Sequence, residues 1–357
     1  MSSLNADEDR AERTVNESLT ANSRAVSLEE AELLAKSHYG IDGRASRLTS
    51  ERDQNFVINA SRDRAYALRI SNPAEDLLVT DFQMSALLHI EHVDPGLPVP
   101  RVIKTVDGRP FFSEAFGDER PRAVRMLTFL PGLPLNTVAR TAAQRRALGA
   151  WAGRLSVALR GFFHPAAGHD LAWDIKNASR LRDLLLHIPD ARRRALAEHF
   201  LNNFEQNALP QLTKLRAQVV HNDLNAFNVL VDADDHDTIV GILDFGDMVH
   251  TSLVNDVAVG ASYQLNSDAP WETAAEFISA YHAVAPLERE EIRLLYDLIA
   301  ARYVVTVAIT GWRAARYPEN SVYILKNNGL AWAGLDYLRQ LPREAAIARL
   351  LAICDME

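Results

Sequence analysis

Residues 219–247 read VVHNDLNAFNVLVDADDHDTIVGILDFGD, and this stretch decides how we interpret the rest of the chain. Its apolar runs are short and bounded by polar turns, which predicts two strands that each end next to a carboxylate. His221-Asn222-Asp223 follows the first run, Asn228 lies five residues after the Asp, and Asp244-Phe245-Gly246 follows the second run. Kinase-like phosphoryl-transfer sites carry their base and metal ligands in this order.

The chemistry of phosphoryl transfer gives three of these residues a role. Moving a γ-phosphoryl group to an alcohol requires positioning, neutralisation of the phosphate charge and a carboxylate that takes the hydroxyl proton. Asp223 is our candidate catalytic base. Asn228 and Asp244 offer the oxygen ligands that Mg²⁺ prefers, with water and phosphate oxygens completing its shell. An isolated Asp or Asn is usually a turn or cap residue, but this order and spacing favour the functional interpretation.

Other polar residues of the stretch have simpler interpretations. We expect His221 to be a structural, hydrogen-bonded histidine, because no second His or Cys stands at metal-ligand spacing. Asp247 either contacts a cationic substrate or caps the turn, and both interpretations stay open. Asp256, which begins an apolar run, is expected to be a helix N-cap or a structural tie.

Composition limits the classes of partner. A chain of 357 residues with 48% hydrophobic and 24% charged content fits an ordinary globular protein of two lobes. A net charge of −9 gives no pull toward nucleic acid or an anionic membrane, and suits a small cationic substrate. Cys354 is the only cysteine, so no intrachain disulfide and no Cys-based metal site can form. We therefore expect a cytoplasmic protein.

Two stretches bear on targeting. Residues 1–24 have neither the apolar run of a signal peptide nor a packing period, so we expect a disordered tail. The most apolar later stretch, residues 298–312, is interrupted by Arg302 and is shorter than the roughly 20 residues that cross a bilayer. It is expected to be a buried helix, and we expect no membrane partner.

Residues 25–130 read as a β-rich, nucleotide-binding lobe. Ser27 and Glu30 form a capping box for a helix that ends at Gly40. The remaining elements expected here are strands within 44–70, a helix at 76–92, and strands at 99–106 and 122–129.

The nucleotide contacts in this lobe are less well specified. The turn 50–55, which contains Asp53, lies where a kinase covers the phosphates, but it has no glycine and can equally be a hairpin turn. Arg69 follows on the next strand, either as the phosphate-binding cation or as an exposed strand residue. Gln83, or Asp81, stands where a kinase helix supplies the partner of that cation, although a solvated helix face explains both.

The lobe boundary is expected near Pro131. Main-chain groups between residues 127 and 130, including those of Thr128 and Leu130, would meet the nucleotide base, or would form only a loop between strands. Residues 131–357 read as a helical lobe with the catalytic loops and the acceptor pocket. Its expected helices begin at a Thr141/Gln144 capping box and continue at 191–208, ended by Pro210, and at 253–264, 271–284, 287–313, 322–339 and 343–353.

HNDLNAFNVL followed by GILDFGDMV resembles the aminoglycoside phosphotransferase and choline kinase superfamily, and within it the hydroxylysine kinases most closely. The resemblance spans about residues 27–341. It implies an α+β, two-lobed protein-kinase-like fold with a small antiparallel-sheet N-lobe and a mainly helical C-lobe. It also implies Mg²⁺ and ATP or GTP, GTP being associated with the hydroxylysine kinases.

By this resemblance, Asp223 is the base, and Asn228 and Asp244 hold the metal. Arg69 replaces the usual lysine and Gln83 stands where a glutamate is expected, departures that affect only the phosphate clamp. The candidate nucleotide-binding residues are Arg69, Gln83, Asp53, Thr128 and Leu130, and the candidate substrate-binding residues are Asp247 and Arg302.

The leading hypothesis is an O-kinase for a small hydroxylated amine or amino acid, active as a monomer or homodimer. Aminoglycoside, homoserine or choline-type kinases are the alternatives among enzymes. A non-catalytic nucleotide-binding scaffold is the alternative of another class, suggested by the missing glycines and the absent Lys–Glu pair.

Overall fold

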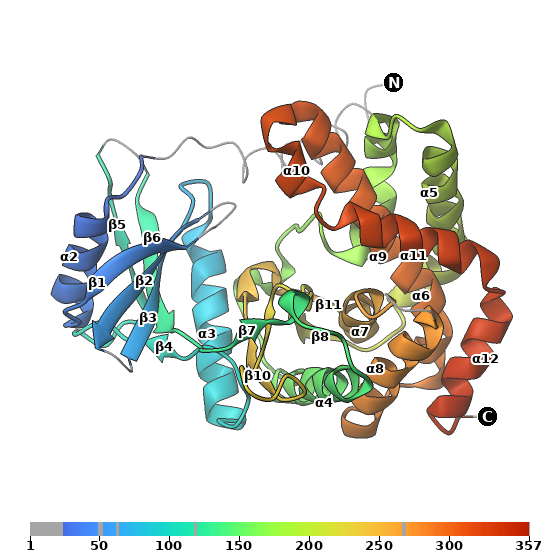
Figure 1. The fold of residues 1–357 in the computed structure, drawn as a ribbon, viewed down its shortest axis with the longest axis horizontal. Helices are drawn as coiled ribbons and strands as arrows, with labels where there is room; N and C mark the ends of the chain where they lie inside the picture. The colour runs from blue at the N-terminus through green and yellow to red at the C-terminus, as the bar shows by residue number, and fades with distance from the viewer. Residues whose placement is uncertain (1–23, 49–52, 62–63, 118–119, 266–268, 357) are drawn as a thin grey trace.

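The structure is a computed structural model that describes residues 24–48, 53–61, 64–117, 120–265 and 269–356. Most of the predicted N-terminal tail and residues 50–52 of the predicted phosphate-covering turn lie outside the described residues. The elements divide into a sheet-containing part and a helical part (Figure 1).

The N-terminal part is built on a six-stranded antiparallel sheet in which β1, β2, β3, β6 and β4 are neighbours in that order, and β5 also pairs with β6. The strands are β1 (Arg44–Leu48), β2 (Gln54–Ser61), β3 (Arg64–Ile70), β4 (Val102–Ile103), β5 (Phe111–Glu114) and β6 (Arg122–Thr128).

Strand periodicity separates the two faces of this sheet. Phe56, Leu68 and Met126 are fully buried on the face that packs against α2 (Leu28–Tyr39). Because successive side chains alternate between faces, Arg69 and Arg125 point to the opposite face. That face is turned toward α3 (Leu77–Val93), which stands between the sheet and the helical part in Figure 1.

The C-terminal part contains two small antiparallel sheets, β7 (Leu133–Pro134) with β9 (Val229–Val231) and β10 (Ile239–Ile242), and β8 (Ala217–Val220) with β11 (Val249–Ser252). Its helices are α4 (Ala142–Ala158), α5 (Ala191–Asn203), α6 (Leu209–Leu212), α7 (Leu253–Ser262), α8 (Pro270–Val284), α9 (Arg289–Arg316), α10 (Ser321–Ile324), α11 (Asn328–Gln340) and α12 (Arg343–Ile353).

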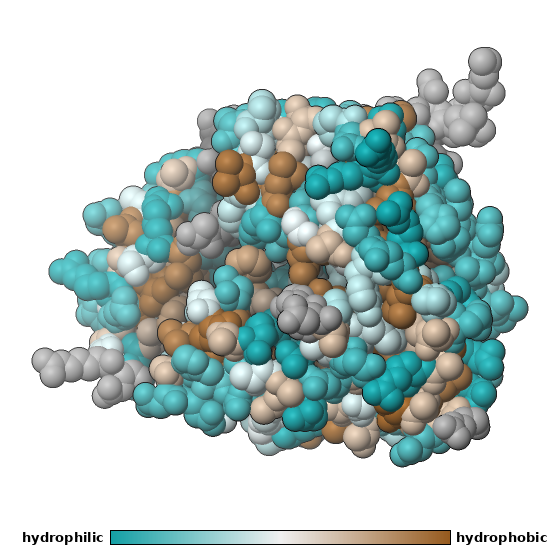
Figure 2. Space-filling model, turned by 45° about the vertical axis from the view of Figure 1, so that its right-hand side comes forward, coloured by the Kyte–Doolittle hydropathy of each residue, from teal (hydrophilic) through white to brown (hydrophobic). Residues whose placement is uncertain are grey.

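Helix α9 is the centre of this part, buried from Leu294 to Thr310 and packed against α5, α7, α11 and α12. The stretch 298–312 is therefore a buried helix, as predicted. No helix among the described residues is long and apolar enough to cross a membrane. Hydrophilic residues predominate on the face shown in Figure 2, with hydrophobic residues in scattered groups.

Local sequence signals fixed several helix ends. Ser27 and Thr141 both form the predicted capping boxes, and Gly40 ends α2 in the left-handed region with φ of 66°. Asp76 and Asp190 cap α3 and α5 through their side chains.

Three element predictions were wrong, and one strand was missed. Of the strand expected at 99–106 only β4 forms, because Pro98 and Pro100 lack the N–H that a ladder needs. Pro210 does not end the helical run, since it occupies the first turn of α6, where no N–H is required. The helix expected at 322–339 is split into α10 and α11, and β5 was not predicted.

Candidate active site

The two loops predicted to carry the chemistry lie side by side. His221 follows β8, and its Nε2 donates to the carbonyl of Leu243, which follows β10, at 3.0 Å. Its Nδ1 accepts the N–H of Asp223 at 3.3 Å. The imidazole is fully buried, and both of its ring nitrogens form hydrogen bonds. This confirms the structural interpretation of His221.

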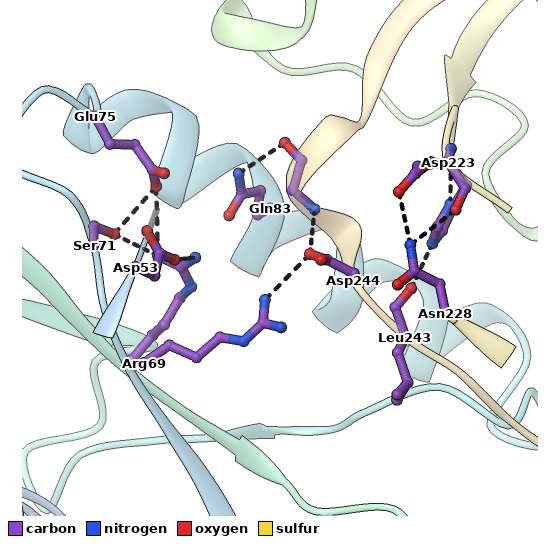
Figure 3. Close-up of polar contacts among 12 residues, drawn as sticks. Asp53, Arg69, Ser71, Glu75, Gln83, Asp223, Asn228, Leu243 and Asp244 are labelled. Carbon is purple, nitrogen blue, oxygen red and sulfur yellow. Dashed lines mark hydrogen bonds and ion pairs between the residues drawn. The ribbon is translucent and has the colours of Figure 1, made fainter. Parts of the chain in front are cut away.

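Both carboxylate oxygens of Asp223 accept hydrogen bonds, of which Figure 3 shows the one from Asn228. Oδ2 accepts from the side-chain amides of Asn225 at 2.9 Å and Asn228 at 2.7 Å, and Oδ1 accepts from Arg302 at 3.2 Å. Its side chain is 20% exposed, at a cavity of about 230 Å³. Burial, followed by the negative charge of Asp247, raises the pKa of Asp223 to about 7 against the opposing effect of Arg302.

The backbone of Asn222, the residue before Asp223, is held by the buried carboxylate of Asp256. Asn222 adopts a left-handed conformation, with φ of 64°, and its N–H donates to Asp256 at 2.7 Å. Asp256 lies inside α7 rather than at its N-cap, so of the two interpretations of this residue the structural tie is correct.

Asn228 and Asp244 present a donor set that fits Mg²⁺. The amide of Asn228 is oriented by donating to Asp223, and among the described residues nothing donates to its Oδ1. Burial raises the pKa of Asp244, but the Arg69 guanidinium, His221 and the N–H of Gly246 together outweigh it and the net shift is downward, so this carboxylate is ionised at neutral pH. No group of three acidic, His or Cys side chains forms a metal cage in the described part of the chain, so phosphate and water must complete the shell.

The phosphate-clamp residues are paired differently from the prediction. Arg69 donates to Oδ1 of Asp244 at 3.4 Å, across the cleft between the two parts. Gln83 does not contact Arg69; its amide donates to the carbonyl of Gly246 at 3.4 Å (Figure 3). Asp81, the other candidate partner, pairs with His164 at 3.0 Å.

A second arginine, which sequence reasoning missed, lies beside Arg69. Arg125 is the register partner of Arg69 on β6, and its side chain is only 3% exposed. It donates to Asp53 at 3.0 Å and Glu75 at 3.4 Å, and to the hydroxyl of Ser71 at 2.5 Å. Burial lowers the pKa of Arg125, but the two carboxylates reverse the effect and hold it above its usual value. Asp53 thus lines the cavity as the partner of Arg125.

The linker between the two parts offers few free main-chain groups. The N–H of Thr128 donates to the carbonyl of Arg101 and the hydroxyl of Thr128 accepts from the N–H of Arg101, both at 2.9 Å. The N–H of Phe129 donates to Ala65 at 3.2 Å. Within the described residues, the next amide, that of Leu130, has no backbone partner outside the regular elements.

The acceptor side of the cavity mixes charges. Asp247 and Arg302, the two predicted substrate residues, line it, and Arg302 also donates to the carbonyl of Trp173 at 3.1 Å with its guanidinium 5.4 Å from that indole ring. The other lining residues on this side, which were not predicted, are Trp173, Tyr263, Thr306, Thr310, Arg313, Tyr323 and Lys326.

Comparisons with known proteins agree with this geometry. The model of the phosphotransferase enzyme family (APH) matches residues 44–295. A hydroxylysine kinase of Mus musculus is 26% identical over 338 residues, covering 88% of this chain and 90% of the relative.

Two solved structures share the fold. A microcompartment-associated aminopropanol kinase matches with a TM-score of 0.63 and 18% identity, covering 88% of this chain and 98% of its own. Amicoumacin kinase in complex with AMP-PNP, Ca²⁺ and its ligand matches with a TM-score of 0.64 and 14% identity, covering 89% and 95%. The predicted α+β, protein-kinase-like fold class is therefore confirmed.

Proposed function

Since this chain belongs to the phosphotransferase enzyme family and is a small-molecule kinase acting on a hydroxyl acceptor, we propose that its acceptor is a small hydroxylated amine or amino acid, as the name hydroxylysine kinase indicates for its relatives. The observation that carries the proposal is the position of Asp223. It reaches the cavity from a loop whose neighbours Asn228 and Asp244 supply oxygen ligands beside it.

Asp223 acts as the base in this proposal. A pKa of about 7 places the carboxylate near the pH at which it exchanges protons most effectively with a hydroxyl. Arg302 and the amides of Asn225 and Asn228 fix its orientation, so that one face of the carboxylate points at the acceptor. The acceptor oxygen loses its proton to Asp223 as it attacks the γ-phosphorus, while the bond from that phosphorus to the β–γ bridging oxygen breaks and the nucleoside diphosphate leaves.

Asn228 and Asp244 would hold Mg²⁺, which when bound neutralises the charge of the phosphates. Arg69 pairs with Asp244 in this structure, and is placed to bind phosphate oxygens once that carboxylate is used by the metal. Leu130 would contact the base, with Asp53 and Gln83 supporting the phosphate side. The donor is ATP or GTP.

Several broader assignments belong to the same proposal. Residues 25–130 form the nucleotide-binding lobe and residues 131–357 the lobe with the acceptor pocket. The buried Cys354, the one cysteine of the sequence, favours the reducing cytoplasm, and we propose that the enzyme is a monomer or homodimer.

The competing proposal is a scaffold without activity, favoured by the phosphate-covering turn without glycine and by Arg69 lacking a glutamate partner on α3. A screen of hydroxylated amino acids, amino alcohols, choline and aminoglycosides, with ATP and with GTP in the presence of Mg²⁺, separates the two. We expect transfer to at least one small amine or amino acid. Nucleotide binding without transfer to any acceptor would instead establish the scaffold.

A further inference from the structure

The cavity beyond Asp223 carries more positive charge than a cationic acceptor would need. Its acidic side chains on the acceptor side are Asp223 and Asp247, whereas its basic side chains are Arg302, Arg313 and Lys326. A pocket for an amine alone would be expected to gather acids, because a buried ammonium must be neutralised. This mixture of acidic and basic side chains suits a ligand that carries both a positive and a negative charge.

Lys326 is the cation whose surroundings point most clearly to a ligand. Its ammonium lies 4.5 Å from the ring centre of Phe227 and 4.3 Å from that of Tyr323. Within the described chain, no carboxylate forms an ion pair with it. Two aromatic faces thus hold this lysine, an exposed residue, at the cavity without an acid beside it.

Lys326 contacts a residue that is adjacent in sequence to one of the candidate metal ligands. Phe227, one of the two rings, immediately precedes the metal-ligand candidate Asn228. One face of α9 also lines the cavity, through residues that recur at helical spacing: Arg302, Thr306, Thr310 and Arg313. Arg313 and Lys326 therefore line the same cavity as Asp223.

We propose that Lys326, supported by Arg313, binds a carboxylate of the acceptor, so that the acceptor is an amino acid with a side-chain hydroxyl rather than a simple amino alcohol. Its ammonium would lie toward Asp247, and its hydroxyl toward Asp223. This inference rests on the proposed function. It makes Lys326 a residue that determines specificity and excludes choline and aminoglycosides, which have no carboxylate, as preferred acceptors.

The test uses acceptors that differ only in the carboxylate. Homoserine is compared with 3-aminopropan-1-ol, and 5-hydroxylysine with the amino alcohol left when its carboxylate is removed. We expect Lys326→Gln to lower kcat/KM for the amino acids by ~10-fold or more, mainly through KM, and to affect the amino alcohols far less. Lys326→Arg should restore most of the loss, and Lys214→Gln, a change of an exposed lysine, should have no effect.

If Lys326→Gln lowers kcat/KM equally for both members of a pair, or lowers neither, the carboxylate site is overturned and the proposed function stays intact. If the wild-type enzyme phosphorylates no acceptor, the proposed function fails, and the site is then judged by calorimetric binding of the same pairs. Weaker binding of the amino acid alone by Lys326→Gln would support the site, whereas unchanged binding, or no binding to the wild-type protein, would overturn it.

Discussion

The two halves of the cavity hold their charged side chains in different ways. In the catalytic half, Asp223, Asn228 and Asp244 come from the loops that follow β8 and β10, and the side chain of Asn228 donates to Asp223 within the first of these loops. In the nucleotide half, Arg69 and Arg125 lie on neighbouring strands, and the acids that neutralise Arg125 come from segments before β2 and before α3.

This difference makes the nucleotide half depend on the catalytic half. Two arginines directly opposite each other on adjacent strands repel, so each needs an anion. Arg125 has Asp53 and Glu75, whereas Arg69 reaches across the cleft to Asp244. A carboxylate proposed as a metal ligand therefore also balances the cation proposed to bind phosphate.

The largest effect is expected in the catalytic half. Asp223→Asn removes the base while keeping the hydrogen-bonding shape, so kcat should fall by ~10²–10⁴-fold with nucleotide affinity nearly unchanged. Steady-state kinetics and a nucleotide titration measure the two quantities. Asp234→Asn, a change of an exposed acid, is the matched control. Unchanged turnover would remove Asp223 from its role.

The next effect is on stability, in the nucleotide half. Arg125→Met leaves Asp53 and Glu75 without their partner, with side chains only 13% and 22% exposed. Breaking a buried pair from one side costs about 3–5 kcal/mol, and we expect a loss of free energy of unfolding of about 3 kcal/mol in urea titrations. A loss below ~1 kcal/mol would show that the Arg125 cluster is not needed to hold this lobe together.

A smaller change should follow loss of the other arginine. Arg69→Met removes the cation proposed to bind phosphate, so KM for the nucleotide should rise ~10- to 100-fold while KM for the acceptor changes little. Arg69→Lys should recover most of the loss, and Arg64→Met, at an exposed position of the same strand, should be neutral. Parallel increases in both KM values would contradict a specific phosphate role.

The smallest change is expected for Gln83→Ala. Its hydrogen bond to Gly246 is long, at 3.4 Å, and bonds of this kind contribute about 1 kcal/mol or less. KM for the nucleotide should therefore rise by less than ~5-fold. A rise as large as that for Arg69→Met would mean that Gln83 joins Arg69 in the nucleotide complex, as the sequence-based interpretation expected.

The catalytic half was predictable because its geometry is local. Asn228 lies only five positions after Asp223, too few for the loop to place them apart, and the Asn228 amide indeed meets Asp223 at 2.7 Å. The structural, hydrogen-bonded role of His221 was predicted from the same stretch of sequence. The antiparallel sheet and the capped helices were predicted for similar reasons, since strand alternation and caps are signals of a few residues.

The contacts that were missed depend on distant parts of the chain. Arg125 meets Glu75 only through the register of β3 with β6 and the entry of the chain into α3. One signal was present: an arginine within the apolar strand RAVRMLT must find an acid when buried. The prediction from the sequence placed Lys326 inside one continuous helix, 322–339. A turn signal, Asn327-Asn328-Gly329, was present next to the break between α10 and α11.

The most direct test of Asp223 as the base is the pH dependence of kcat/KM. Because burial and Asp247 raise the pKa of Asp223 to about 7, and only the unprotonated carboxylate accepts a proton, kcat/KM should fall tenfold per pH unit below about pH 7. Asp247→Asn removes a charge that raises this pKa, so the fall should move to lower pH. A profile that stays flat down to pH 5, or one that Asp247→Asn does not move, would contradict the assignment.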